Sequence, residues 1–143
     1  GRHLLKLFLK LTLYVWTFPN SLIGLLLGLI GLLTQGRVQV REGCLEFFGG
    51  GVSWLLNRLG RRGVAAMTLG HTVLGQDRQT LDLVRSHEQI HVSQYEKWGV
   101  LFIPVYLGCS AYLWVAGKDC YRNNPFEQQA YRLEDPAVKN WRR

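Results

Sequence analysis

The residues with the clearest capacity for chemistry lie in the segment HEQIH, at positions 87–91. On a helix, side chains four positions apart lie on one face, so His87 and His91 can bind one metal ion together. Zinc accepts neutral imidazole nitrogens and, in catalytic sites, keeps one position for water. Glu88 can contact that water without binding the metal. The pattern therefore predicts a zinc hydrolase site with Glu88 as the general base.

A zinc site of this kind needs a third protein ligand, and its position separates the known classes. A histidine six residues after His91 would indicate a metzincin, but Lys97 occupies that position. A glutamate on a later helix would indicate a gluzincin. Glu127 fits this requirement, because Asn124-Pro125 predicts the start of a helix just before it. Glu134 is the weaker alternative, and Glu127 could instead serve only to complement the positive end of its helix.

The elements around this motif follow from apolar periodicity and turn signals. Helix-forming residues continue from Gln79 to Lys97, with Asp77 or Thr80 as the N-cap, so HEQIH lies on a helix. The other predicted elements are a β-hairpin over 37–48 with a turn at Glu42-Gly43, helical turns over 52–59, one strand over 64–74, and a last helix from Pro125. These elements indicate an α+β fold.

An apolar block near the start of the chain predicts attachment to a membrane. Residues 11–33 carry no charged side chain, and a helix of that length spans a hydrocarbon core of about 30 Å. Pro19 interrupts the block and leaves two arrangements open. One is a single tilted and kinked helix, and the other is a helical hairpin over 4–17 and 21–33 that enters one leaflet and returns. Basic residues at both ends favour the hairpin slightly.

Three glycines of this block, Gly24, Gly28 and Gly31, recur on one helix face. They predict close packing against another membrane helix, in this chain or in a partner subunit, unless they only reflect how common glycine is in membrane helices. The net charge is +7, and basic residues flank the block. This distribution indicates a surface near membrane lipid and not a nucleic-acid-binding protein. The three cysteines are widely spaced and predict neither disulfides nor a cysteine zinc site.

The apolar segment 100–116 must fold back if the zinc site is to form. If it crossed the bilayer, His91 and Glu127 would lie on opposite sides of the membrane. Its short length and Pro104 permit a buried or interfacial helix instead. The HEQIH helix is itself too polar on all sides to belong to an intramembrane protease of the site-2 type.

Nearly the whole chain resembles an uncharacterised family of small bacterial membrane-associated proteins, themselves similar to minimal gluzincin metallopeptidases. The similar segments include FPNSLIGLLLG (18–28), TLGHTVLGQD (68–77), HEQIHVSQYEKWG (87–99) and YRNNPFEQQAY (121–131). The resemblance implies that His87, His91 and Glu127 are zinc ligands and that Glu88 is the catalytic base. One departure is Gln128-Gln129, where a more charged pair is expected, so Glu127 is the only acid in its motif.

Three further residues are candidates to line the cleft. His71 is predicted to lie on the strand before the HEQIH helix, where it would line the site or bind an oxyanion, unless it is an exposed strand histidine. Tyr131 and Tyr95 are candidate oxyanion donors, although core packing would explain each of them equally well.

The sequence thus favours a membrane anchor over 1–35 followed by a zincin-like metal-binding domain over 36–143. The predicted activity is peptide hydrolysis by zinc-activated water. The predicted location is the bacterial inner membrane or another energy-transducing membrane, with the soluble part on the cytoplasmic side. The alternative is a non-catalytic accessory subunit of a larger membrane protein complex, with a structural or vestigial metal site.

Overall fold

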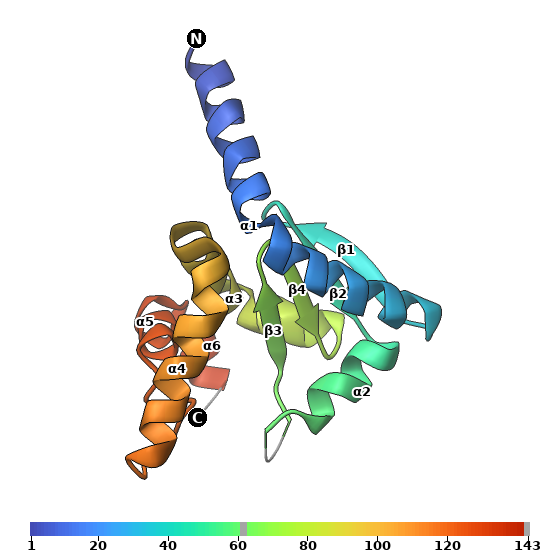
Figure 1. Ribbon diagram of the computed structural model, residues 1–143. Helices are drawn as coiled ribbons and strands as arrows, with labels where there is room; N and C mark the ends of the chain where they lie inside the picture. The colour runs from blue at the N-terminus through green and yellow to red at the C-terminus, as the bar shows by residue number, and fades with distance from the viewer. Residues whose placement is uncertain (61–62, 142–143) are drawn as a thin grey trace.

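The computed structural model describes residues 1–60 and 63–141 and has an α+β architecture (Figure 1). In chain order the elements are α1 (Arg2–Leu33), β1 (Arg37–Arg41), β2 (Cys44–Phe48), α2 (Gly50–Arg58), β3 (Ala66–Leu69), β4 (Thr72–Gly75), α3 (Arg78–Trp98), the 3-10 turn η1 (Gly99–Leu101), α4 (Phe102–Val115), α5 (Pro125–Leu133) and α6 (Pro136–Trp141). The predicted fold class is therefore confirmed at this level.

The four strands form one mixed sheet in the order β1-β2-β4-β3. Strands β1 and β2 are the predicted hairpin, and Glu42 and Gly43 form its turn with φ values of 52° and 72°. Two residues with positive φ are what a tight hairpin requires. Strand β2 pairs in parallel with β4, and β4 pairs antiparallel with β3. This order places β3 at one edge of the sheet.

The prediction of one strand over 64–74 is wrong, because the chain reverses at Gly70-His71. Gly70 has a φ of +63°, a left-handed conformation that glycine adopts without steric cost. The reversal turns the apolar run into two short strands, β3 and β4. His71 consequently lies in the turn between them and not on a strand.

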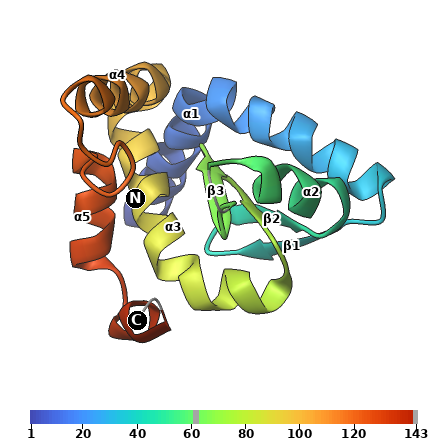
Figure 2. The same cartoon turned by 90° about the horizontal axis from the view of Figure 1, so that it is seen from below.

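Helices cover both faces of the sheet, and the alternation of side chains along each strand fills two separate cores. Figure 2 shows α3 on one side of the sheet and α1 with α2 on the other. The core beneath α3 contains Cys44, Phe48, Val73, Leu81 and Val92. The core beneath α1 and α2 contains Phe47, Val52, Leu56, Leu69 and Leu74.

Helix α1 is one continuous helix with Pro19 inside it, so the structure has the kinked single helix and not the helical hairpin. Proline removes one backbone hydrogen bond and bends a helix. In Figure 1 the first half of α1 projects away from the sheet, and the second half lies across it.

The glycine face of α1 does not pack against another membrane helix, which corrects that prediction. Gly24 lies against Thr72, Gly28 against the ring of Phe47, and a Cβ atom at Gly28 would come within 2.5 Å of that ring. Gly31 lies against Val52 in the same way. The small residues let the helix approach the chain's own sheet and α2.

Two helical stretches of the described chain, Arg2–Leu33 and Arg78–Val115, are long and apolar enough to cross a membrane by length and composition. In the most apolar 18-residue segment of each stretch, only 33% and 17% are buried, so most of these side chains face outward. In the second stretch the apolar part is η1 and α4. Figure 2 shows α4 and the second half of α1 along the same side of the molecule.

Helix α4 folds back beside α5, as the metal hypothesis requires. The chain turns at Gly99, which has a φ of +58°. The side-chain amide of Asn124 then donates to the backbone carbonyl of Tyr106 over 3.1 Å, which joins α4 to the start of α5. His91 and Glu127 therefore lie on the same side of the molecule.

Candidate metal centre

Two capped helices present the candidate ligands. Asp77 is the N-cap of α3, and its carboxylate accepts from the backbone N–H of Thr80 over 2.7 Å. Asn124 is the N-cap of α5, with Pro125 at the first helical position. Both helix starts agree with the sequence prediction. An N-cap residue lies directly before the helix that it begins, so a local sequence pattern identifies it.

His87, His91 and Glu127 come together in a buried group that can hold a metal ion. The two Nε2 atoms are 3.2 Å apart, and they lie 3.1 Å and 3.2 Å from Oε2 of Glu127. Two neutral imidazole nitrogens and a carboxylate oxygen all direct lone pairs to one point. A positive charge, either a proton or a metal ion, must lie among them to make this burial favourable.

The spacing of this group suits zinc. Zinc binds histidine nitrogen and carboxylate oxygen at about 2.0–2.1 Å, which at a tetrahedral angle places two ligand atoms about 3.3 Å apart. The three observed separations lie close to that value. Three protein ligands also leave a fourth position for water, as in catalytic sites.

A second layer of hydrogen bonds fixes both imidazole rings. Nδ1 of His87 donates to the buried carboxylate of Glu134 over 2.7 Å. Nδ1 of His91 donates to Oε1 of Gln94 over 2.8 Å. The amide nitrogen of Gln94 donates to the Phe126 carbonyl and to Gln129, so its oxygen is the acceptor for the ring. Both Nε2 atoms are thereby left free to bind a metal.

In the absence of a metal, a protonated histidine and the Glu127 carboxylate stabilise each other's charges. Burial alone would lower the pKa of His91, but the hydrogen bond and the negative charge of Glu127 outweigh it and raise that pKa to about 9. Burial alone would raise the pKa of Glu127, but hydrogen bonds from His87 and His91 lower it to about 2. The group therefore carries a proton that a metal ion would replace.

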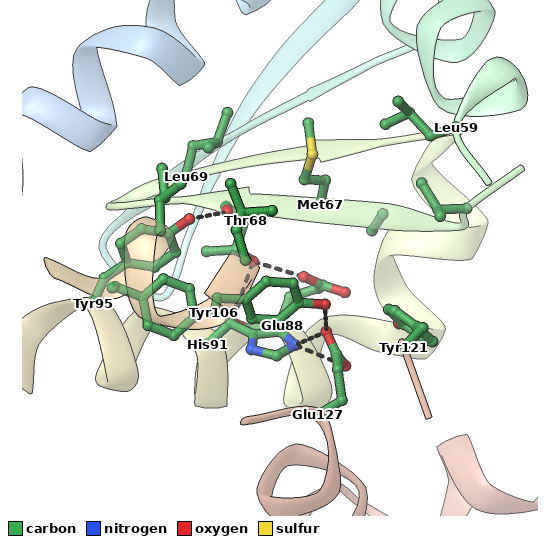
Figure 3. A pocket seen from close by; sticks show the side chains of 15 residues that line it. Leu59, Met67, Thr68, Leu69, Glu88, His91, Tyr95, Tyr106, Tyr121 and Glu127 are labelled. Atoms are coloured by element: carbon green, nitrogen blue, oxygen red, sulfur yellow. Dashed lines mark hydrogen bonds and ion pairs between the residues drawn. The ribbon is translucent and has the colours of Figure 1, made fainter. Parts of the chain in front are cut away.

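Glu88 lies beside the metal group and is held by the sheet. The Thr68 hydroxyl on β3 donates to its carboxylate over 2.6 Å. Figure 3 shows this carboxylate on the β3 side of His91 and Glu127. The Tyr106 hydroxyl on α4 donates to the other oxygen of Glu127 over 3.0 Å. The Glu88 carboxylate, which is not among the candidate ligands, thus lies next to the group of His87, His91 and Glu127, as a general base requires.

The group opens into a cavity of about 290 Å³ between β3 and α4. Its walls are mostly apolar and include Met67, Leu69, Ile103 and Leu107, with Glu88, His91 and Glu127 at its base. A reacting group of a substrate can therefore reach the metal group from this cavity.

The other candidate residues have different places. His71 does not line the cavity at the site, because its ring lies between the Thr17 hydroxyl at 2.6 Å and the Glu96 carboxylate at 2.9 Å. This position corrects the prediction that it lines the cleft. The Tyr95 hydroxyl donates to the backbone carbonyl of Thr68 over 2.9 Å. The Tyr131 ring packs against His87 at 5.0 Å between centroids. It lines a second cavity, of about 830 Å³, which shares Glu88 with the first.

The sequence interpretation did not identify Gln94, Thr68 or Tyr106, and it considered Glu134 only as a rival ligand. Gln94 carried a usable signal, because it lies one helical turn after His91. Thr68 and Tyr106 carried none, because their roles depend on how β3 and α4 pack against α3. All three cysteines are free and lie outside the ligand group.

Comparisons with protein-family models, with curated proteins and with solved structures find no match for this chain. What the site can do is therefore argued from its own geometry.

Proposed function

We propose that the protein is a membrane-attached zinc metallopeptidase of the gluzincin-like kind. The observation that carries the proposal is the juxtaposition of His87, His91 and Glu127 with Glu88 at the base of an open cavity. The outer hydrogen bonds from Glu134 and Gln94 prepare both rings for metal binding. Such prepared ligand sets are typical of metal sites.

Each residue has a distinct role in the proposed reaction. His87, His91 and Glu127 would hold Zn²⁺, which when bound polarises the scissile carbonyl and acidifies water. Glu88 accepts the proton from the attacking water and delivers it to the leaving amine. Thr68 keeps the Glu88 carboxylate oriented through its 2.6 Å hydrogen bond. Tyr106 orients Glu127.

Strand β3 favours a polypeptide substrate over other compounds with a hydrolysable carbonyl. It is the edge strand of the sheet, and four of its residues line the cavity: Ala66, Met67, Thr68 and Leu69. An extended peptide can pair with the backbone groups that an edge strand leaves unpaired, and on β3 the Thr68 carbonyl already accepts from Tyr95.

Attachment to the membrane is proposed through the outward apolar sides of α1 and α4. The cytoplasmic side and the bacterial inner membrane rest on the basic residues at both ends of the first apolar block and stay predictions. The accessory-subunit alternative rested partly on the glycine face, which the sheet of the same chain covers.

Three proteins test the proposal: wild type, Glu88→Gln and His87→Ala, each purified in detergent. We expect about one zinc per chain in wild type and in Glu88→Gln, and loss of zinc in His87→Ala. Hydrolysis of a quenched fluorescent peptide library should fall by about 10²–10⁴-fold in Glu88→Gln. A wild type without zinc, or a Glu88→Gln protein as active as wild type, would contradict the proposal.

A further inference from the structure

Two cavities meet at Glu88, and only the second has lysine and arginine side chains in its lining. The apolar cavity of about 290 Å³ extends from Glu88 along β3 toward α4. A second cavity of about 830 Å³ extends toward residues 117–122 and includes Lys118, Asp119 and Arg122. The residues that line both cavities are Val64, Ala66, Glu88 and Tyr121. A chain bound across Glu88 would therefore have one side in apolar and the other in charged surroundings.

The charged cavity favours an acidic occupant. The carboxylate of Asp119 accepts from the backbone N–H groups of Tyr121 and Arg122, over 2.9 Å and 2.8 Å. The other acid of the lining, Glu88, lies at the opposite end, where the two cavities meet. The charges of Lys118 and Arg122 exceed that of Asp119 and attract negative groups.

The apolar cavity opens toward the side of the molecule that faces lipid in the proposed orientation. Leu107 lines the cavity and is also 58% exposed on α4, so it belongs both to the rim and to the outer surface. Leu101 in η1 and Val115 at the end of α4 are also exposed. The second half of α1 also has exposed leucines, Leu22, Leu26 and Leu29. Figure 2 shows this half of the helix along the same side of the molecule as α4. An exposed apolar area of this extent marks a surface that contacts lipid or another apolar partner.

We infer that the site binds polypeptides at the point where an apolar, membrane-inserted segment meets an acidic, water-exposed segment. This inference rests on the proposed peptidase function and names its substrate class. The apolar residues enter the cavity beside α4 from the bilayer, and the acidic residues lie near Lys118 and Arg122. The peptide bond between them lies at Glu88, and the edge of β3 offers its backbone to a polypeptide but not to an acyl chain.

A binding experiment tests the substrate class without relying on turnover. Zinc-containing Glu88→Gln protein is reconstituted in phosphatidylcholine vesicles and titrated with a fluorescent peptide of a leucine block joined to a glutamate block. We expect Leu107→Asn in this background to weaken binding about tenfold. Leu101→Asn is the matched control, since Leu101 is 57% exposed but lines neither cavity, and it should stay within about twofold. Leu107→Met keeps the side-chain volume and should bind like the parent protein.

The charged end has its own test. A peptide with a leucine block joined to a lysine block inserts into the vesicle membrane as well as the glutamate peptide does. We expect it to bind the protein about tenfold more weakly than the glutamate peptide. Arg122→Glu should reduce that difference. Equal effects of Leu107→Asn and Leu101→Asn, or equal binding of the two peptides, would overturn the inference. So would a fluorescent fatty acid that binds as tightly as the glutamate peptide and is weakened equally by Leu107→Asn, since the cavity would then belong to a lipid.

The two proposals fail separately. If wild type cleaves soluble peptides but shows no preference for the block peptide, the peptidase proposal stands and the proposed substrate class is wrong. Glu88→Gln protein that binds the block peptide, paired with a wild type that never cleaves it, would mean the reverse.

Discussion

Replacement of Glu134 should weaken zinc binding although Glu134 is not a ligand. Its carboxylate accepts the Nδ1 proton of His87 over 2.7 Å, and both side chains are only 1% exposed. This bond selects the tautomer in which Nε2 of His87 is free to bind metal, and the negative charge makes the ring a stronger donor to the metal. Without it, the ring can rotate or place its proton on the ligand nitrogen.

The size of the effect follows from what each substitution removes. Loss of an outer hydrogen bond at a metal ligand costs about 10–100-fold in metal affinity, or about 1.4–2.7 kcal/mol. Glu134→Gln keeps an acceptor oxygen and loses the charge, so we expect about tenfold. Glu134→Ala loses both, so we expect about 100-fold.

Competition for zinc with a chelating dye measures these affinities on detergent-purified protein. Asp135→Asn is the matched control, because it removes the same charge one residue further along, from an exposed side chain. Thermal unfolding of the metal-free proteins separates metal affinity from stability. If Glu134→Gln and Glu134→Ala both bind zinc as tightly as wild type, the assignment of His87 Nε2 as a ligand atom is wrong.

Three further predictions concern the same architecture. Gln94→Met removes the acceptor for His91 Nδ1 and should weaken zinc binding about tenfold in the same dye assay; an unchanged affinity would count against the tautomer assigned to His91. Gly28→Ala forces a Cβ atom against the ring of Phe47 and should lower the free energy of unfolding in denaturant by about 1–3 kcal/mol, whereas Gly108→Ala, with nothing within 4 Å, should be neutral or stabilising. Because the pKa of His91 is about 9 without metal, its ring is protonated at pH 7, so zinc binding should release protons and tighten as the pH rises toward 9. Calorimetry in buffers of different ionisation enthalpy counts these protons, and a count of zero would be incompatible with this charge state.

The parts of the site that the sequence predicts are those that local interactions determine. The spacing of His87 and His91 follows from the helical repeat, and Asp77 and Asn124 cap their helices with neighbouring residues. Glu127 was a candidate because a predicted helix start stands just before it. The roles of Tyr106 and Thr68 depend on long-range packing, which no short sequence pattern encodes.

The wrong predictions for the 64–74 strand and for the glycine face of α1 have a common physical cause. The Gly70-His71 turn lies inside an apolar run whose residues would suit one long strand equally well, and only the pairing of β3 with β4 decides the matter. The glycines of α1 specify a close approach but not the partner. A sheet surface that contains Phe47 and Thr72 allows the same close approach as a second helix would.

The polar residues at the bend of α1 connect this helix to the walls of the site. The Asn20 amide donates to the carbonyl of Gly99 over 3.0 Å, at the joint that precedes α4. The Ser21 hydroxyl accepts from the backbone N–H of His71 over 2.9 Å, in the turn that follows β3. Helix α4 and strand β3 are the two walls of the apolar cavity. Because α1 is hydrogen-bonded to the end of each wall, a displacement of α1 would move both walls of the cavity.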